Sequence, residues 1–305
     1  MEIAITPLPG GFGARVEADL ARLTGSAMAD VLTKALHRHR VLIVPSQHLN
    51  HADLLAVAAL FGEADTATDL RYTVPGFPGL TVVSNIHKDG EPIGIYDGDQ
   101  EEEWHADNSF KTELTAATLL YSVITPGEGG ETRFADATRA HADLPAGLRA
   151  RVDGLSAVHS VQHLAARQTD ASGGRSSTQS GTLAKLPEVT HPLAPVHPAT
   201  GARALLLGSM VIPRVLGMSE ADSQVLLTDL LAYTTGPGYL YTHRWKQGDL
   251  VVWDNLAVLH TASPCDSARH PRLLVRAAVR QPTRHPDTPD EGIPAEPLIS
   301  RSNRH

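Results

Sequence analysis

The stretch Gly248-Asp-Leu-Val-Val-Trp-Asp-Asn-Leu-Ala-Val-Leu-His260 has the pattern of two short strands joined by a polar bend. Its first apolar run is short enough for a strand, and Asp254-Asn255 interrupts it before a second run leads to His260. Many short strands at uneven spacing predict an all-β sandwich or barrel. The clearest strand candidates in the chain are Leu80–Ser84, Ala117–Ile124, Ala204–Leu207, Leu250–Asp254 and Leu273–Val279.

Three segments have helical patterns instead, and two of them follow a residue that can cap a helix. They are residues 26–40, residues 50–60 with Asn50 as the cap, and residues 219–232 with Ser219 as the cap. An apolar strand over residues 41–45 follows the first helix. We therefore expect a mainly β fold with flanking helices, in which residues 1–305 form a single domain and the N-terminal helices lie within about residues 13–63.

The composition narrows the class of protein. Hydrophobic residues make up 42% of the 305, which is enough for a sizeable core, and the formal net charge of −8 argues against a nucleic-acid surface. The single cysteine, Cys265, excludes an internal disulfide framework and a Cys-rich zinc site. Residues 1–10 lack the pattern of a signal peptide, and no apolar run reaches the ~18 residues of a membrane span. We expect a cytoplasmic protein with neither nucleic acid nor membrane as partner, and leave a homo-oligomer open.

Two segments are too polar to form part of a core. Residues 168–182 are rich in glycine and serine, which predicts a mobile lid over a site or a passive insertion, with equal weight on each. Residues 282–305 carry several prolines, which predicts an extended tail.

A metal site is indicated by a His-x-Asp triplet in the run Trp104-His-Ala-Asp-Asn-Ser-Phe110. Two histidines and one carboxylate leave open coordination positions, as non-haem iron oxygenases require. Residues i and i+2 of extended backbone point to one face, so His105 and Asp107 can meet one ion. Other such triplets have helical or tail surroundings that separate the two side chains; they are His51/Asp53, His141/Asp143 and His285/Asp287.

The third ligand should be a neutral imidazole on another inward-facing strand. His260 has this setting at the end of the apolar run described above. Its competitors are His243, next to Arg244, and His270, between a basic residue and a proline. We therefore predict His105, Asp107 and His260 as the metal ligands.

Several motifs in this order resemble the taurine/2,4-D dioxygenase (TauD/TfdA) family of Fe(II)- and 2-oxoglutarate-dependent dioxygenases. They are Trp104-His-x-Asp-Asn-Ser-Phe110, Gly129-Gly-Glu-Thr132, His197-Pro-x-Thr-Gly201, Trp245-x-x-Gly-Asp249, Trp253-Asp-Asn255, His260 and the pair Arg272/Arg276. The resemblance runs from about residue 41 to residue 280. One departure is Leu256, where many relatives have arginine.

The resemblance implies a double-stranded β-helix, a cupin-like jelly roll, with Fe(II) bound by His105, Asp107 and His260. It also implies that Thr132 and Arg272 bind the far carboxylate of the co-substrate 2-oxoglutarate, a role suited to a bidentate guanidinium. The implied reaction uses O2 and hydroxylates an unactivated C–H bond of a small organic molecule, releasing succinate and CO2. Desaturation, epimerisation or ring formation with the same cofactors is an alternative. A zinc-dependent hydrolase using the same triad is an alternative from a different class.

The primary substrate is expected to be anionic, because the resemblance places such a group at Arg276. Further candidates for substrate contact are Asn85, Tyr96 and Asn108. Weaker candidates for the walls of the site are Tyr72, Glu101 and Met210.

Overall fold

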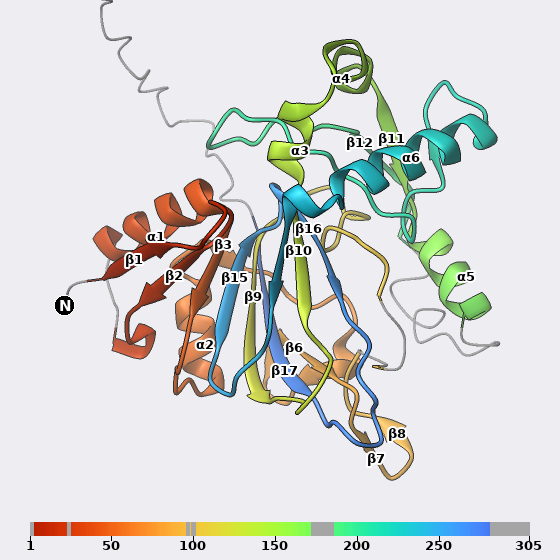
Figure 1. Cartoon of the computed structure of the whole chain (residues 1–305). Coiled ribbons are helices and arrows are strands. Elements are labelled where there is room, and N and C mark those ends of the chain that lie inside the picture. The colour runs from red at the N-terminus through yellow and green to blue at the C-terminus, as the bar shows by residue number, and fades with distance from the viewer. Residues whose placement is uncertain (1–2, 23–25, 96–97, 99–101, 172–185, 281–305) are drawn as a thin grey trace, which may run out of the picture.

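The largest sheet joins strands from both ends of the chain. In the computed structural model, which describes residues 3–22, 26–95, 98, 102–171 and 186–280, nine strands form this sheet. Their order is β1 (Ala4–Pro7), β2 (Ala14–Glu17), β3 (Val41–Val44), β15 (Leu250–Asp254), β9 (Thr115–Ile124), β17 (Leu273–Arg280), β6 (Phe77–Ser84) and β5 (Thr73–Val74), with β4 (Glu63–Ala64) also paired to β17. Only β2 and β3 pair in parallel within it. Central strands therefore come from segments far apart in sequence (Figure 1).

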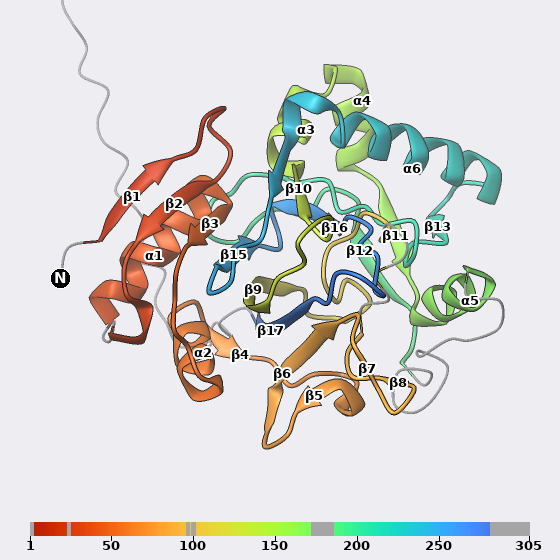
Figure 2. The ribbon, with the colours of Figure 1, turned by 60° about the horizontal axis from the view of Figure 1, so that its bottom comes forward.

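A smaller antiparallel sheet faces the centre of the large one. It consists of β14 (Leu240–His243), β10 (Thr132–Asp136) and β16 (Val258–Ala262). Figure 2 shows β10 and β16 lying across from β9 and β17. Apolar side chains fill the space between the sheets: Phe134 of β10 packs on Trp253 of β15, with ring centroids 5.4 Å apart. This two-sheet arrangement is the predicted jelly-roll core.

Two helices cover the other face of the large sheet. They are α1 (Ser26–His39) and α2 (His51–Ala58), and their apolar residues join a core cluster with β3, β6 and β17. Asn50 caps α2 through a reciprocal pair of hydrogen bonds with Asp53. The predicted cap is confirmed, and it also explains why the His51/Asp53 triplet is no metal site: the Asp53 carboxylate is engaged at the helix start.

Most of the remaining elements contribute to a second core cluster, which includes Ala135 and Leu259 of the small sheet. The helices are α3 (Ala137–Asp143), α4 (Ala146–Asp153), α5 (Val161–Ala171) and α6 (Glu220–Thr234), and the third sheet consists of β12 (Val189–Pro192), β11 (Ser156–His159) and β13 (Arg214–Val215). A hairpin is formed by β7 (His87–Lys88) and β8 (Glu91–Pro92), and short 3-10 turns are Leu20–Arg22, Leu70–Tyr72 and Pro237–Tyr239. Ser219 caps α6 as expected. Within the described residues, no helix combines the length and the apolar character needed to cross a membrane.

Some expectations differ from the structure. The predicted strand Ala204–Leu207 is buried but forms no regular strand, because its N–H groups bond to three separate residues, Pro195, Ala137 and Leu193, rather than to one ladder. Residues 13–63 contain the predicted strand, β3, but also β2, which was not predicted. In β2 the alternating buried and exposed side chains were a period-two signal that the helical interpretation missed.

The expected lid or insertion falls mostly outside the described residues. Residues 168–171 form the last turn of α5, and residues 172–182 are not described, so the lid or insertion stays a prediction. The predicted extended tail, residues 282–305, also lies outside them, as do the candidate residues Tyr96 and Glu101.

Candidate active site

The structure brings together the three predicted metal ligands. His105 and His260 form an isolated antiparallel bridge, with each backbone N–H donating to the other carbonyl at 3.0 and 2.9 Å. Directly opposed residues project their side chains on one face, and the two imidazole centroids lie 4.3 Å apart. Asp107 follows two residues later, with its Oδ2 3.8 Å from Nε2 of His260. One potential ligand atom of each residue lies within 4.8 Å of the others.

The backbone around Asp107 departs from the expected strand. His105 takes part in a single bridge, and Asp107 begins a turn in which Asn108 adopts a positive φ of 53°. Asn255 holds this turn: its Oδ1 accepts from the Asp107 N–H at 2.8 Å, and its Nδ2 donates to the Asp107 carbonyl at 3.1 Å. The Trp253-Asp-Asn255 bend thus holds the backbone of Asp107, a predicted metal ligand, in place.

Burial and charge keep the ligands in the ionisation states that a metal needs. Burial by itself would raise the pKa of Asp107, but Arg276 and then the two histidines outweigh it and lower the pKa to about 2. Burial, with His105 acting in the same direction, lowers the pKa of His260 to about 3. At neutral pH, Asp107 is therefore a carboxylate and His260 a neutral imidazole, the forms that coordinate a cation.

The orientation of His105 also fits a metal ligand. Its Nδ1 lies 2.8 Å from the carbonyl oxygen of Glu103, which can only accept a hydrogen bond. Nδ1 therefore carries the proton, and the lone pair of Nε2 is left for a cation. Metal-binding histidines usually donate their other N–H in this way. Two imidazoles and one carboxylate form a donor set suited to Fe(II).

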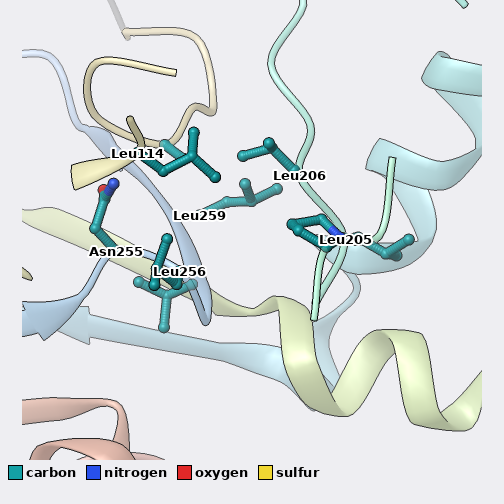
Figure 3. A pocket seen from close by; sticks show the side chains of 9 residues that line it. Leu114, Leu205, Leu206, Asn255, Leu256 and Leu259 are labelled. Carbon is teal, nitrogen blue, oxygen red and sulfur yellow. The ribbon is translucent and has the colours of Figure 1, made fainter. Parts of the chain in front are cut away.

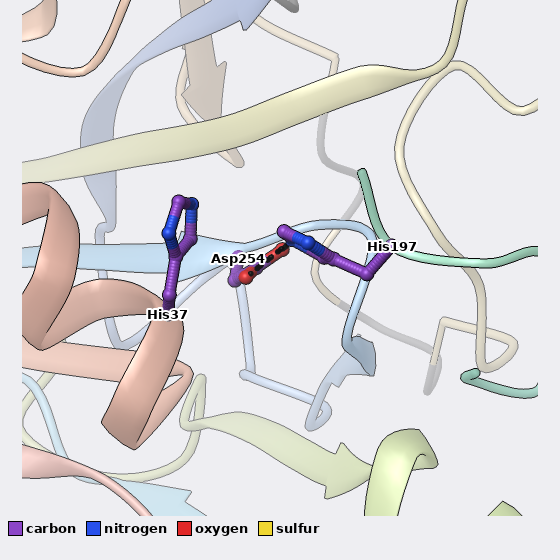
Figure 4. Close-up of side chains that lie close together, drawn as sticks. All are labelled: His37, His197 and Asp254. Carbon is purple, nitrogen blue, oxygen red and sulfur yellow. Dashed lines mark hydrogen bonds and ion pairs between the residues drawn. The ribbon is translucent and has the colours of Figure 1, made fainter. Parts of the chain in front are cut away.

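A second cluster, His37, His197 and Asp254, has similar composition and spacing (Figure 4). Its chemistry differs. Nδ1 of His197 accepts the backbone N–H groups of Ala199 and Thr200 at 3.1 and 3.2 Å, so the proton is on Nε2. Nε2 then donates to Asp254 Oδ2 at 3.0 Å and has no lone pair for a metal. We assign this cluster to holding the Asp254-Asn255 bend, not to metal binding.

The predicted 2-oxoglutarate residues lie at the starts of two strands, one paired with the strand of His260 and the other carrying Arg276. Thr132 is the first residue of β10. Phe134, two residues further along the same strand, pairs with His260. Arg272 directly precedes β17 and is only 1% exposed. A guanidinium suits a carboxylate because its N–H groups can donate two parallel hydrogen bonds to it. A Cβ at Gly130 would lie 3.1 Å from Cδ of Arg272, so glycine leaves room for this side chain.

Trp245 was quoted as part of a motif but was not predicted as a site residue. Its indole Nε1 donates to the Thr132 hydroxyl oxygen at 3.1 Å, and both residues are buried. Because the indole can only donate, the Thr132 hydroxyl is left to donate its own hydrogen elsewhere. His243, a rejected ligand candidate, packs edge-on against Trp245 and lies with its Nε2 3.2 Å from Oδ2 of Asp249.

Among the predicted substrate residues, Arg276 lies at the triad. It is on β17, and its Nη1 donates to Oδ1 of Asp107 at 2.8 Å. Asn108 is in the turn that follows Asp107 and donates to the Thr115 hydroxyl at 3.0 Å. Asn85 is buried, with its amide engaged by the Arg272 N–H at 2.8 Å and the His270 carbonyl at 3.1 Å.

The weaker wall candidates lie in two different places. Tyr72 belongs to the 3-10 turn beside β5, and Met210 lies in the segment after Gly208; both are half-buried. A Cβ at Gly208 would contact the carbonyl oxygen of Trp104 and Cα of His105. The segment around Gly208 therefore packs against the backbone that carries His105.

Leu256, which stands where many relatives have arginine, lines a small apolar pocket (Figure 3). The pocket lies against the backbone that carries the predicted metal ligands. Its neighbours include Ala106, between the two first ligands, and Leu259, next to the third. Because alternate residues of extended backbone point to opposite faces, these side chains point away from the metal site. The other lining residues are Leu114, Pro195, Leu205, Leu206, Asn255 and Val258. Leucine therefore extends an apolar core here.

The remaining His-x-Asp triplets have other surroundings. His141 lies in the last turn of α3, and its Nε2 is 2.7 Å from Oδ1 of Asp153. His87, which the sequence interpretation overlooked, begins an analogous triplet in the exposed β7–β8 hairpin. The tail triplet is outside the described residues.

Known proteins resemble the chain over almost its whole length. Residues 4–278 match the family described as taurine catabolism dioxygenase TauD, TfdA family. An (S)-phenoxypropionate/alpha-ketoglutarate-dioxygenase of Sphingobium herbicidovorans is 32% identical over 275 residues, covering 86% of this chain and 90% of that protein. An alpha-ketoglutarate-dependent sulfate ester dioxygenase of Pseudomonas putida is 31% identical over 283 residues, covering 92% and 90%. The crystal structure of AAD-2 in complex with Mn(II) and N-oxalylglycine superposes with a TM-score of 0.74 at 27% identity, covering 93% of this chain and 100% of that one.

Proposed function

The chain belongs to the TauD/TfdA family, and we propose that it hydroxylates a C–H bond of a small anionic molecule. Family membership makes it a dioxygenase that depends on Fe(II), 2-oxoglutarate and O2. The observation that carries the substrate proposal is Arg276, a cation at the metal ligands that is distinct from the predicted 2-oxoglutarate arginine. Two relatives of the chain, the phenoxypropionate and sulfate ester dioxygenases, are named for anionic substrates, which supports the proposal.

His105, Asp107 and His260 would hold the iron. Asp107 and His260 are buried and His105 is half-buried, which limits access of water to the site. When bound, iron and 2-oxoglutarate supply the oxidation, in which O2 is consumed and succinate and CO2 are released. Arg272 would pair with the far carboxylate of 2-oxoglutarate. The Thr132 hydroxyl, with its oxygen already accepting from Trp245, would donate to the same carboxylate.

Arg276 would hold the anionic group of the primary substrate close to the metal. Asn108 follows Asp107 in the turn, and we propose that it contacts the same molecule. Tyr96 and Asn85 remain predicted substrate contacts; the buried Asn85 amide is already bonded to the segment around Arg272, so it also supports that arginine. A carboxylate, sulfonate, sulfate ester or phosphonate would satisfy Arg276.

A substrate screen tests this function. The protein is loaded with Fe(II) and 2-oxoglutarate, and succinate is measured with each of a set of aryloxyalkanoates, alkyl sulfates and sulfonates, and with neutral analogues of the same carbon skeletons. We expect succinate above the background without substrate for anionic compounds only. Equal stimulation by the neutral analogues would contradict the anionic-substrate proposal while leaving the dioxygenase class intact.

The mass of the product separates hydroxylation from the alternatives. Hydroxylation adds one oxygen to the substrate; where the hydroxylated carbon already bears an ether or sulfate oxygen, the product splits into a carbonyl compound and an alcohol or sulfate whose masses together contain that added oxygen. Desaturation or ring closure removes two hydrogens, and epimerisation leaves the mass unchanged. The zinc-hydrolase alternative is wrong, because members of this family are oxidoreductases.

A further inference from the structure

The two carboxylate oxygens of Asp107 have different partners. Oδ1 accepts from Nη1 of Arg276 at 2.8 Å. Oδ2 accepts from Oγ1 of Thr118 at 2.8 Å, and it is also the oxygen that lies 3.8 Å from Nε2 of His260. One oxygen is therefore held by a cation, and the other is shared by a hydroxyl and the imidazole of a predicted ligand.

We propose that Thr118 is a positioning residue that sets the rotation of the Asp107 carboxylate and turns Oδ2 toward His260. This proposal rests on the assignment of Asp107 as an iron ligand. The terminal torsion of an aspartate is broad and roughly two-fold, so a single partner leaves the plane of the carboxylate poorly defined. Two donors on different strands, Thr118 of β9 and Arg276 of β17, define it.

Thr118 is suited to this role by its place in the fold. It lies in β9, at the centre of the nine-stranded sheet, paired with Trp253 of β15 on one side and with Ala278 of β17 on the other. Its side chain is fully buried, and its β-branched Cβ restricts the first torsion. Most buried hydroxyls have a hydrogen-bond partner, and that of Thr118 is the carboxylate.

The main chain of Asp107 is tied to the same strand. Nδ2 of Asn255 donates both to the Asp107 carbonyl and to the carbonyl of Thr115, the first residue of β9, each at 3.1 Å. β9 therefore fixes the backbone of the ligand through Asn255 and its carboxylate through Thr118. Partners that orient a metal ligand in this way typically contribute about 10- to 100-fold to metal affinity.

The test uses Co(II) as a probe, because its visible absorption reports coordination geometry independently of turnover. Thr118→Ser and Thr118→Ala both lose the γ-methyl group and differ only in the hydroxyl. We expect the metal-free Thr118→Ser protein to bind Co(II) with near-wild-type affinity and spectrum. Thr118→Ala, and Thr118→Val with its nearly native shape, should bind roughly 10- to 100-fold more weakly and show a changed spectrum.

Ser122→Ala is the matched control, since Ser122 is a buried hydroxyl four residues further along β9 whose Oγ has no hydrogen-bond partner among the described residues. It should bind Co(II) as the wild type does. Equal affinity and equal spectra for Thr118→Ser and Thr118→Ala would overturn the proposal. Unchanged binding by Asp107→Ala would instead overturn the ligand assignment, so the two failures can be told apart.

Discussion

Nη1 of Arg276 lies 2.8 Å from Oδ1 of Asp107, so the cation predicted to bind substrate is also the counter-charge of a predicted iron ligand. The pair is not a surface ion pair, because Asp107 is buried and the Arg276 side chain is only 21% exposed. A bound anion at Arg276 would sit beside the ligand carboxylate. Under the proposed function, substrate recognition and metal binding would share the Arg276 side chain.

Arg272 and Arg276 should have separable effects. Arg272→Ala should weaken 2-oxoglutarate binding by roughly 10- to 100-fold, because a charge-assisted contact in a buried site is lost. Arg276→Ala should largely spare 2-oxoglutarate, raise the KM for the primary substrate and weaken metal binding, since Asp107 loses its counter-charge. Titration with 2-oxoglutarate and metal, and steady-state kinetics, measure these constants. The substrate assignment of Arg276 fails if both variants change only the 2-oxoglutarate constant.

The two His/His/Asp clusters should respond differently to substitution. His260→Ala or Asp107→Ala should abolish binding of one Fe(II) per chain and 2-oxoglutarate turnover. His197→Asn should keep the metal, because Nε2 of His197 carries a proton, and should lower the melting temperature through loss of its bonds to Asp254 and to the Ala199 and Thr200 N–H groups. Metal analysis and thermal unfolding check both. Loss of iron from the His197 variant alone would reverse the assignment.

The clustering of the three predicted metal ligands could be expected from sequence, because each lies in a local pattern that gives its orientation. His105 and Asp107 are two residues apart in a non-helical run, and His260 follows an apolar run and lies in the middle of β16. The turn at Asp107 was not predicted, because it depends on Asn255, which is 148 residues away in sequence.

Thr118 could not be predicted, because nothing around it in the sequence marks it apart from other polar residues in buried strands. Its role depends on the register of β9 against β15 and β17. The predicted strand Ala204–Leu207 was wrong for a different reason. An apolar run predicts burial, which is confirmed, but burial alone does not decide which backbone groups pair.

Trp245→Phe should weaken 2-oxoglutarate binding without affecting metal affinity. The substitution removes the indole N–H that donates to the Thr132 hydroxyl oxygen. One hydrogen bond is worth about 0.5–1.5 kcal/mol, so we expect roughly a 2- to 10-fold rise in the dissociation constant. In a Thr132→Val background the same substitution should have little further effect. Additive effects of the two substitutions would show that Trp245 acts by another route.

His159 should make the protein sensitive to acid. It is fully buried at the end of β11, its ring centroid lies 5.0 Å from that of His191, and neither of its ring nitrogens has a hydrogen-bond partner among the described residues. Burial, and then the neighbouring His191, lower its pKa from 6.5 to about 3. Between these values the unfolded chain binds the proton and the folded chain does not, so stability falls as the pH falls through this window.

We predict that His159→Leu flattens this dependence. The His159 linkage alone should cost the wild type about 2 kcal/mol of unfolding free energy between pH 7 and pH 5, since one pKa unit corresponds to about 1.4 kcal/mol. The variant lacks the titrating group, so its loss over the same range should be smaller by about that amount. Urea unfolding of the metal-free proteins at both pH values measures the difference. His141→Leu is the control, because the His141 imidazole faces Asp153 and is not isolated. Parallel losses in the wild type and His159→Leu would show that His159 titrates normally in the folded protein.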